Sequence, residues 1–270
     1  PAPGFVYEAR DSASEADWLD GAEAMVWDSL AARISAPAYT AALAAWLRPR
    51  ARVIEGARYA GWDGAIRLGS GERITAGAVV LAQGFSLFAA LEALMGGSVG
   101  AGVKGQVAML RLPETYAWVR RRPLIYDDGV YVVPKQDPLP GGGVGVALGG
   151  TDEKTWRDPS SADPAKAVFI ERAHILCPTL RAGDVVSHWA GVRPKCWQRD
   201  PIVGRLPVEA PLWVVGGGFK ISLGIAHRLG ESLVDRLTAR DPHAPLPETF
   251  EVAHHLAAMR PLKATPDQST

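Results

Sequence analysis

An arginine at the end of a predicted strand, followed directly by a proline, is the residue in this sequence best suited to bind a small acid. Arg193 follows Gly191-Val192 at the end of a predicted strand and precedes Pro194. Because this backbone is restricted, the planar guanidinium can offer two parallel hydrogen bonds to a carboxylate. The alternative is a surface arginine paired with an acidic side chain, the commoner situation for a single arginine.

Tyr131 is a second polar group that could meet such an acid. It lies in an alternating segment, residues 130–134, in which Tyr131 and Val133 share one face of a strand. A tyrosine hydroxyl directed into a cavity can bind a carboxylate. A tyrosine in a sheet more often packs its ring and leaves the hydroxyl at the rim. The preceding Asp128-Gly129 predicts a tight turn.

Three consecutive glycines, Gly216 to Gly218, join a predicted buried strand to a predicted helix. Glycines leave out side chains where a flat or phosphorylated ligand could approach the backbone. The free N–H groups at the start of the helix favour an anion or an electron-rich carbonyl. The alternative is an ordinary strand-to-helix turn that binds nothing, so this pattern alone leaves both interpretations open.

The elements that position these residues are of two kinds. Short buried strands, 78–82 and 212–215, and amphipathic helices stand near both ends of the chain, whereas longer antiparallel strands fill the middle. We expect a mixed α/β fold with these parts: an incomplete α/β domain from residues 1–100 and 201–240, an inserted antiparallel-sheet domain at 101–200, and a poorly ordered tail at 241–270. Further predicted elements are a strand at 52–60, a helix from Ser35 to Leu47, and a helix capped by Asp163 that runs to Leu176.

Composition argues against several classes of protein. The 270 residues are 47% apolar and their formal charges cancel, so neither nucleic acid nor a membrane surface is an expected partner. No apolar run approaches the length needed to span a bilayer. Two cysteines, Cys177 and Cys196, make neither a disulfide framework nor a metal site, and a cytoplasmic setting is expected.

Taken in order, these segments resemble the C-terminal two-thirds of the D-amino-acid-oxidase superfamily, which includes glycine oxidases and sarcosine oxidases. The resemblance covers roughly residues 30–238 and rests on their joint order. The segments that carry it are residues 79–84, 129–134, 147–151, 189–194, 200–207 and 216–224. It implies FAD as cofactor, with the α/β part as a Rossmann-like FAD-binding domain and the sheet as the substrate domain.

The resemblance also implies roles for individual residues. Arg193 would anchor the substrate carboxylate, Tyr131 would assist it, and Lys220 is similar to a lysine that contacts a carboxylate in sarcosine oxidases. No catalytic side chain is expected, because the flavin does the redox chemistry. Ala147 falls near the place of the oxygen-activating lysine of those enzymes. The residues expected to face the flavin are Gly84, Gly216, Gly217, Gly218, Phe219, Ser222, Gly224 and Ile225.

One family feature is missing. The GxGxxG turn that binds the ADP half of FAD is not found in this sequence. The glycine-rich segment Gly141-Gly142-Gly143 leads into a strand rather than a helix, which predicts a hairpin loop. Roughly 70–100 residues of a Rossmann-type start would be needed. They could be missing from this sequence, lie on a second polypeptide, or have been lost from a remnant that no longer binds FAD.

Two functions follow from these alternatives. The first is an FAD-dependent oxidoreductase that oxidises the C–N bond of a small amino acid or secondary amine carboxylate by hydride transfer. The second is a flavin-less protein, or a subunit, that binds a small carboxylate or acts as a scaffold.

Overall fold

The computed structural model describes residues 4–11, 17–20, 22, 24–163, 167–240 and 245–262 of the chain. The chain forms two compact units, each built from two separate segments. The sheet unit comprises the residues up to Ser35 and Lys104–Val192, and the α/β unit comprises Ala36–Val103 and the residues from Arg193 onward. Residues before 36 thus join the sheet unit, which differs from the domain boundaries predicted above. The mixed α/β fold class is as predicted.

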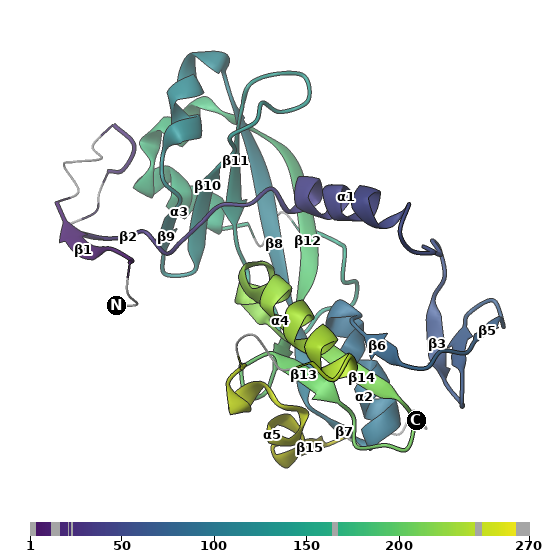
Figure 1. The fold of residues 1–270 in the computed structure, drawn as a ribbon. Helices are drawn as coiled ribbons and strands as arrows, with labels where there is room; N and C mark the ends of the chain where they lie inside the picture. The colour runs from purple at the N-terminus through teal and green to yellow at the C-terminus, as the bar shows by residue number, and fades with distance from the viewer. Residues whose placement is uncertain are drawn as a thin grey trace, which may run out of the picture. The chain divides into compact units, whose positions relative to one another are not determined.

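The sheet unit is built on a five-stranded sheet in the order β12-β8-β11-β10-β9, labelled in Figure 1. The four strands from β8 to β9 pair antiparallel, as the middle of the sequence predicts. The bounds of β8 and β12 extend a few residues past the unit boundary. The strands are β8 (Gly100–Leu112), β9 (Ile125–Asp127), β10 (Val130–Pro134), β11 (Val144–Gly149) and β12 (Asp184–Cys196).

The core of this unit shows the predicted alternation along β10. Val130 and Val132 are buried against the helix α3 (Phe169–Leu176), whereas Tyr131 lies on the other face. The helix α3 begins at Phe169, so the prediction that Asp163 caps it is wrong. The backbone N–H of Asp163 instead donates to Gln106 Oε1 at 2.6 Å, which ties that residue to β8.

Shorter elements complete the sheet unit. An antiparallel hairpin of β1 (Tyr7–Arg10) and β2 (Met25–Asp28) lies near its start. The predicted turn between β9 and β10 is present, with positive φ angles of 38° at Asp128 and 88° at Gly129. Two 3₁₀ segments are η3 (Glu114–Arg121) and η5 (Pro178–Ala182).

The α/β unit contains a three-stranded sheet in the order β13-β14-β6, in which β14 and β6 are parallel and β13 is antiparallel to β14. Leu212 and Val214 of β14 pack with the helix α2, and Val215 packs with α4 on the opposite face. The two-sided burial predicted for these strands is therefore confirmed for β14, whereas it is wrong for β6, where Val80 is exposed. The elements are β6 (Val79–Leu81), β13 (Ile202–Arg205), β14 (Leu212–Gly216), α2 (Leu87–Met95) and α4 (Ser222–Leu237).

The remaining elements of this unit correct two predictions. The strand expected at 52–60 is β3, which spans only Tyr59–Trp62, because the residues before it have no strand partner. The expected disorder after residue 240 is wrong for residues 245–262, where His255 of α5 is 1% exposed and donates from Nε2 to Pro201 O at 3.0 Å. The helix α1 (Ala36–Leu47) is present as predicted, although none of its side chains is buried. The other elements are α5 (Val252–Ala257), β4 (Ile66–Leu68), β5 (Arg73–Ile74), β7 (Gly97–Ser98), β15 (Arg260–Pro261), η2 (Gly84–Ser86), η6 (Phe219–Ile221) and η7 (Glu248–Phe250).

Candidate functional site

The candidate site lies where two parallel strands of the α/β unit end. Leu81 of β6 pairs with Val214 of β14, so the segments that follow both strands emerge at one edge of the sheet. One of these segments is Gln83-Gly84, and the other is the glycine turn, Gly216 to Gly218. Ligands of open α/β sheets bind at the carboxyl ends of parallel strands, so this edge is the natural place for one.

The glycine turn packs tightly against the protein itself. A Cβ at Gly216 would lie 2.7 Å from Leu87 Cδ2, and one at Gly217, whose φ is +76°, would overlap Cys196 Sγ. A Cβ at Gly218 would lie 2.8 Å from Ser222 Oγ. Internal packing thus explains why no side chain fits at these three positions, and their contact with a flavin remains a prediction.

Two other predicted cofactor residues do face open space. Apart from their chain neighbours and the backbone of their own helix, no atom of the described residues lies within 4 Å of the Cβ position of Gly84, which has a φ of +59°, or of Gly224 in the first turn of α4. Among the described residues no side chain caps α4, whose N-cap position is Ile221. The side-chain oxygen of Gln83 is buried and has no hydrogen-bond partner among the described residues.

Three cations gather around one aromatic ring at the start of α4. The guanidinium carbon of Arg193 lies 5.8 Å from the centre of the Phe219 ring, and the ammonium of Lys220 lies 5.6 Å from it. Lys195 Nζ is nearer, at 5.1 Å. Phe219 has a φ of +46°, a strained conformation for a bulky residue that is typical of functional sites. The structure therefore brings Arg193 and Lys220 together.

Sequence reasoning missed Lys195, although the signal was present. Residues two apart on a strand share a face, and Arg193 and Lys195 both belong to β12. The backbone of Lys195 also forms a bridge with Gly218, which places the strand directly beside the glycine turn.

Tyr131 belongs to the sheet unit. It pairs across the sheet with Tyr126 and Gly149, and its ring lies 4.6 Å from that of Tyr126. The ring is half-buried, on the face of β10 away from Val130 and Val132. Its role toward a substrate remains a prediction.

Neither cysteine is a candidate nucleophile or point of flavin attachment. Cys196 is fully buried beneath Gly217, and burial raises the pKa of its thiol to about 12, with a smaller contribution from Asp200. Burial likewise raises the pKa of Cys177 to about 12. The thiolate is the reactive form, so both side chains act as core residues.

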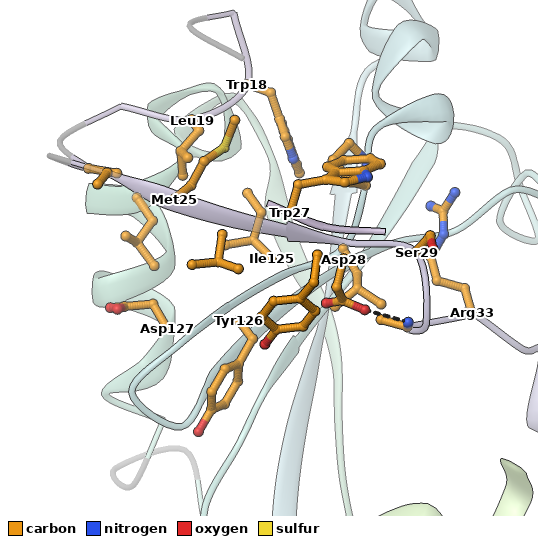
Figure 2. A pocket seen from close by; sticks show the side chains of 18 of the residues that line it. Trp18, Leu19, Met25, Trp27, Asp28, Ser29, Arg33, Ile125, Tyr126 and Asp127 are labelled. Atoms are coloured by element: carbon orange, nitrogen blue, oxygen red, sulfur yellow. Dashed lines mark hydrogen bonds between the residues drawn. The ribbon is translucent and has the colours of Figure 1, made fainter. Parts of the chain in front are cut away.

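The sheet unit has a cavity of its own, shown in Figure 2, with a volume of about 680 Å³. It lies between the β1–β2 hairpin and β9, and its polar groups largely have partners within the protein. Asp28 accepts from the Ala31 N–H at 2.7 Å, and Arg33 donates to Pro134 O at 3.0 Å. The larger side chains around it are Trp18, Met25, Trp27, Ile125 and Tyr126.

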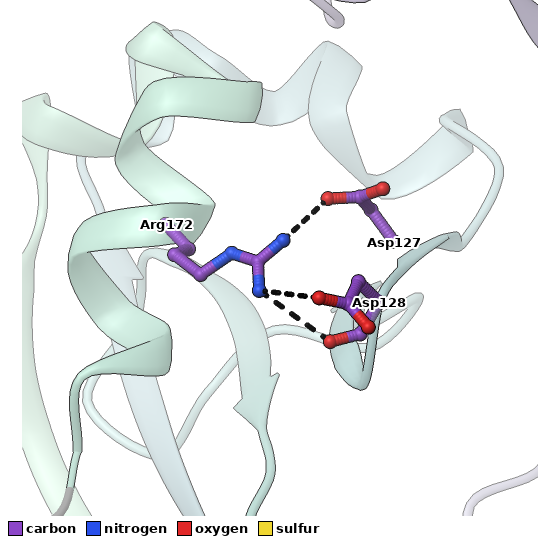
Figure 3. A network of polar contacts seen from close by, with 3 residues as sticks. All are labelled: Asp127, Asp128 and Arg172. Carbon is purple, nitrogen blue, oxygen red and sulfur yellow. Dashed lines mark hydrogen bonds and ion pairs between the residues drawn. The ribbon is translucent and has the colours of Figure 1, made fainter.

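Beside this cavity, Figure 3 shows an arginine matched by two acids. Arg172 of α3 lies 2.9 Å from Asp127 Oδ2 and 3.2 Å from Asp128 Oδ2. The hydrogen bonds to Asp128 and then to Asp127 raise the pKa of Arg172. This contact ties α3 to the β9–β10 turn.

The described residues contain neither a candidate metal site nor a helix that could span a membrane. Across residues 24–163, 167–240 and the shorter described stretches, no group of three or more His, Cys, Asp or Glu could hold a metal ion. Among the helices of the same ranges, none is long and apolar enough to cross a membrane.

Known proteins with related sequences include glycine oxidases. The enzyme of Pseudomonas putida is 27% identical over 140 residues, which make up 52% of this chain and 36% of that protein. The enzyme of Geobacillus kaustophilus is 24% identical over 192 residues, covering 69% of this chain and 47% of that protein. The chain thus spans about a third to a half of the length of these relatives.

Solved structures show the same fold. The glycine oxidase of Geobacillus kaustophilus superposes with a TM-score of 0.78 at 22% identity, covering 93% of this chain and 67% of that one. L-Proline dehydrogenase from P. horikoshii gives a TM-score of 0.78 at 16% identity, covering 96% of this chain and 71% of that one. The model of the family described as FAD dependent oxidoreductase matches residues 6–232. The chain therefore belongs to the FAD-dependent oxidoreductase family of the D-amino-acid-oxidase type.

Proposed function

We propose that this protein oxidises the C–N bond of a small amino acid or secondary amine carboxylate, with FAD as hydride acceptor. The observation that carries this proposal is the convergence of Arg193 and Lys220 on the ring of Phe219, at the start of α4. The sequence similarity to glycine oxidases supports a small amino acid as substrate.

The residues at this edge of the sheet fit a flavin ring. The uncapped N-terminus of α4 suits an electron-rich carbonyl, because its N–H groups carry partial positive charge. Gly84 and Gly224 leave open space where a flat ring could approach, and the buried Gln83 Oε1 has no hydrogen-bond partner among the described residues. When bound, FAD would accept two electrons and one hydrogen from the substrate carbon that bears the nitrogen.

The protein's own part is to bind and orient the substrate. Arg193 holds the carboxylate through charge-assisted hydrogen bonds, with Lys220 as a second cation and Tyr131 as an assisting hydroxyl. The amine is bound neutral, so that its lone pair can form the C=N bond as the hydride leaves the carbon. Water then adds to the imine and releases a carbonyl compound and an amine or ammonia. No protein base is needed for this sequence of steps.

Anaerobic mixing tests this function directly. The purified protein, with FAD added, is mixed with glycine or sarcosine while the flavin absorbance is followed, and glyoxylate is measured. Loss of the absorbance with matching glyoxylate supports the proposal. A colourless protein that takes up no FAD, yet binds glycine in calorimetry, would indicate the carboxylate-binding alternative and contradict the proposal.

A further inference from the structure

The cavity of the sheet unit (Figure 2) has the size and the lining of a ligand site. Its volume of about 680 Å³ falls within the range of small-molecule pockets, roughly 300–1,000 Å³. The aromatic side chains of Tyr7, Trp27 and Tyr126 line it, and the two tyrosines are largely exposed to solvent. A flat apolar ligand would cover these rings, because aromatic surfaces stack on one another.

Trp18 brings an unsatisfied hydrogen-bond donor to this cavity. Its side chain is 1% exposed, and its Nε1 has no hydrogen-bond partner among the described residues. Figure 2 shows the indole pointing into the cavity, toward Trp27. A buried N–H without an acceptor destabilises the protein, since the group has given up its hydrogen bonds to water. A ligand that places an oxygen atom against this N–H would satisfy it.

Two arginines give one side of the cavity a positive charge. Arg33 is held in place through Nη1, which donates to Pro134 O at 3.0 Å and to Arg120 O at 3.4 Å. Its Nη2 forms no hydrogen bond within the described part of the chain. Arg121 is exposed and has neither a hydrogen bond nor an ion pair there. Both arginines also line a second cavity, of about 1010 Å³, so they lie where the two cavities meet.

The carboxylates around the cavity do not neutralise these arginines. Asp28 accepts from the Ala31 N–H at 2.7 Å, and Asp127 is paired with Arg172 at 2.9 Å. Neither carboxylate forms an ion pair with Arg33 or Arg121 among the described residues. An anionic group on a ligand would therefore supply the counter-charge, through charge-assisted hydrogen bonds to the guanidinium groups.

We propose that this cavity is a binding site for a planar aromatic acid. The ring system of the acid stacks among the aromatic side chains, its anionic group binds Arg33 and Arg121, and an oxygen on the ring accepts from Trp18 Nε1. The site is independent of the proposed function, because neither Arg193 nor Lys220 lines the cavity.

Calorimetry with the purified protein tests the site, using 6-hydroxy-2-naphthoate as the probe. Two analogues each lack one of its features: 6-hydroxy-2-naphthamide lacks the charge, and 2-naphthoate lacks the ring hydroxyl. We expect the amide to bind about 10-fold more weakly than the probe, and 2-naphthoate about threefold more weakly. Added salt should weaken the binding of the two acids and leave that of the amide unchanged.

Two variants assign these preferences to residues. Arg121→Gln should weaken both acids about fivefold and the amide less than about twofold, since it removes one cation. Trp18→Phe keeps an aromatic ring and removes the N–H, so the preference for the ring hydroxyl should be lost while the preference for acid over amide remains. Thermal unfolding shows whether each variant is folded. Arg121 is exposed, so its variant tests the site even if Trp18→Phe does not fold.

The matched control is Arg157→Gln, because Arg157 is also an exposed arginine of the sheet unit but does not line the cavity. It should leave all three affinities unchanged. Equal weakening of the acids by Arg157→Gln and Arg121→Gln would refute the site, and so would an amide that binds as tightly as the probe.

The same titration separates this site from the proposed function. Arg193→Gln should leave the binding of the probe unchanged. If the probe instead depends on Arg193 and not on Arg121, the aromatic acid site is refuted and the carboxylate-binding role proposed for Arg193 is supported. If none of the three compounds binds, the aromatic acid site alone is refuted.

Discussion

Two clusters of charge in this protein are organised in opposite ways. In the sheet unit, Arg172 is matched by the carboxylates of Asp127 and Asp128 (Figure 3). In the α/β unit, Arg193, Lys195 and Lys220 converge on one ring. The first arrangement balances its charge within the protein and serves the fold. The second concentrates positive charge beside a strained turn, which suits an anionic ligand.

The glycine turn should be the most sensitive point of the fold. Gly217→Ala places a Cβ against Cys196 Sγ at a φ of +76°, and we expect it to reduce the free energy of unfolding by about 2–4 kcal/mol. Chemical denaturation measures this. The matched variant is Gly224→Ala, whose Cβ enters open space within a helix. It should leave stability unchanged or raise it by up to about 1 kcal/mol, yet weaken FAD binding. Equal destabilisation by both variants would contradict the distinction between structural and ligand-facing glycines.

Acid should destabilise the α/β unit through His255. Burial lowers the pKa of His255 from its ordinary value of 6.5, and the hydrogen bond to Pro201 opposes this only in part. The unfolded chain therefore binds a proton more readily than the folded chain. The contribution of neutral His255 to the free energy of unfolding is fully present above pH 6.5, the ordinary pKa. This contribution is lost as the pH falls from there through the lowered pKa of the folded state.

His255→Gln should flatten this pH dependence, measured by urea unfolding at pH 8 and pH 5. His227→Gln is the control, since His227 is exposed on α4. In the sheet unit, burial also lowers the pKa of His174, opposed by Glu171, so part of the dependence should persist in the variant. An unchanged slope in His255→Gln would mean that His255 is not the titrating group.

The smallest effect is expected from the cluster that the protein balances itself. Arg172→Met removes exposed ion pairs, so stability should fall less than in Gly217→Ala, and carboxylate binding should not change. Thermal unfolding and ligand titration check both points. A marked loss of carboxylate affinity in Arg172→Met would contradict the contrast between the two clusters, because Arg172 would then share the carboxylate-binding role proposed for Arg193.

Local patterns predicted much of this architecture. Patterns that span only a few residues predict three of its features: the alternation of β10, the Asp128-Gly129 turn and the two-sided burial of β14. These patterns are the spacing of apolar residues and the residue types of tight turns. The convergence of Arg193 and Lys220 could be predicted only from the resemblance to the oxidase family, because the two residues lie far apart in the sequence.

Long-range packing explains what the sequence did not show. The glycine turn is filled by Leu87 and Cys196, which come from other segments. Asp163 donates its backbone N–H to Gln106 on β8, and His255 of α5 is buried and bonded to Pro201 O. The spacing of Lys195 and Arg193 on β12 predicts a shared face, but the contact of Lys195 with Phe219 depends on the folded chain.

The binding of a carboxylate by Arg193 beside the flavin is tested most directly by titrating the FAD-containing protein with acetate and following the flavin difference spectrum. We expect a saturable change for the wild type, a shift of about 100-fold or more in apparent Kd for Arg193→Met, and no shift for Arg260→Met. Arg260→Met is the matched control, because the guanidinium of Arg260 lies over the ring of Trp197. Equal affinity of the wild type and Arg193→Met for acetate would contradict it.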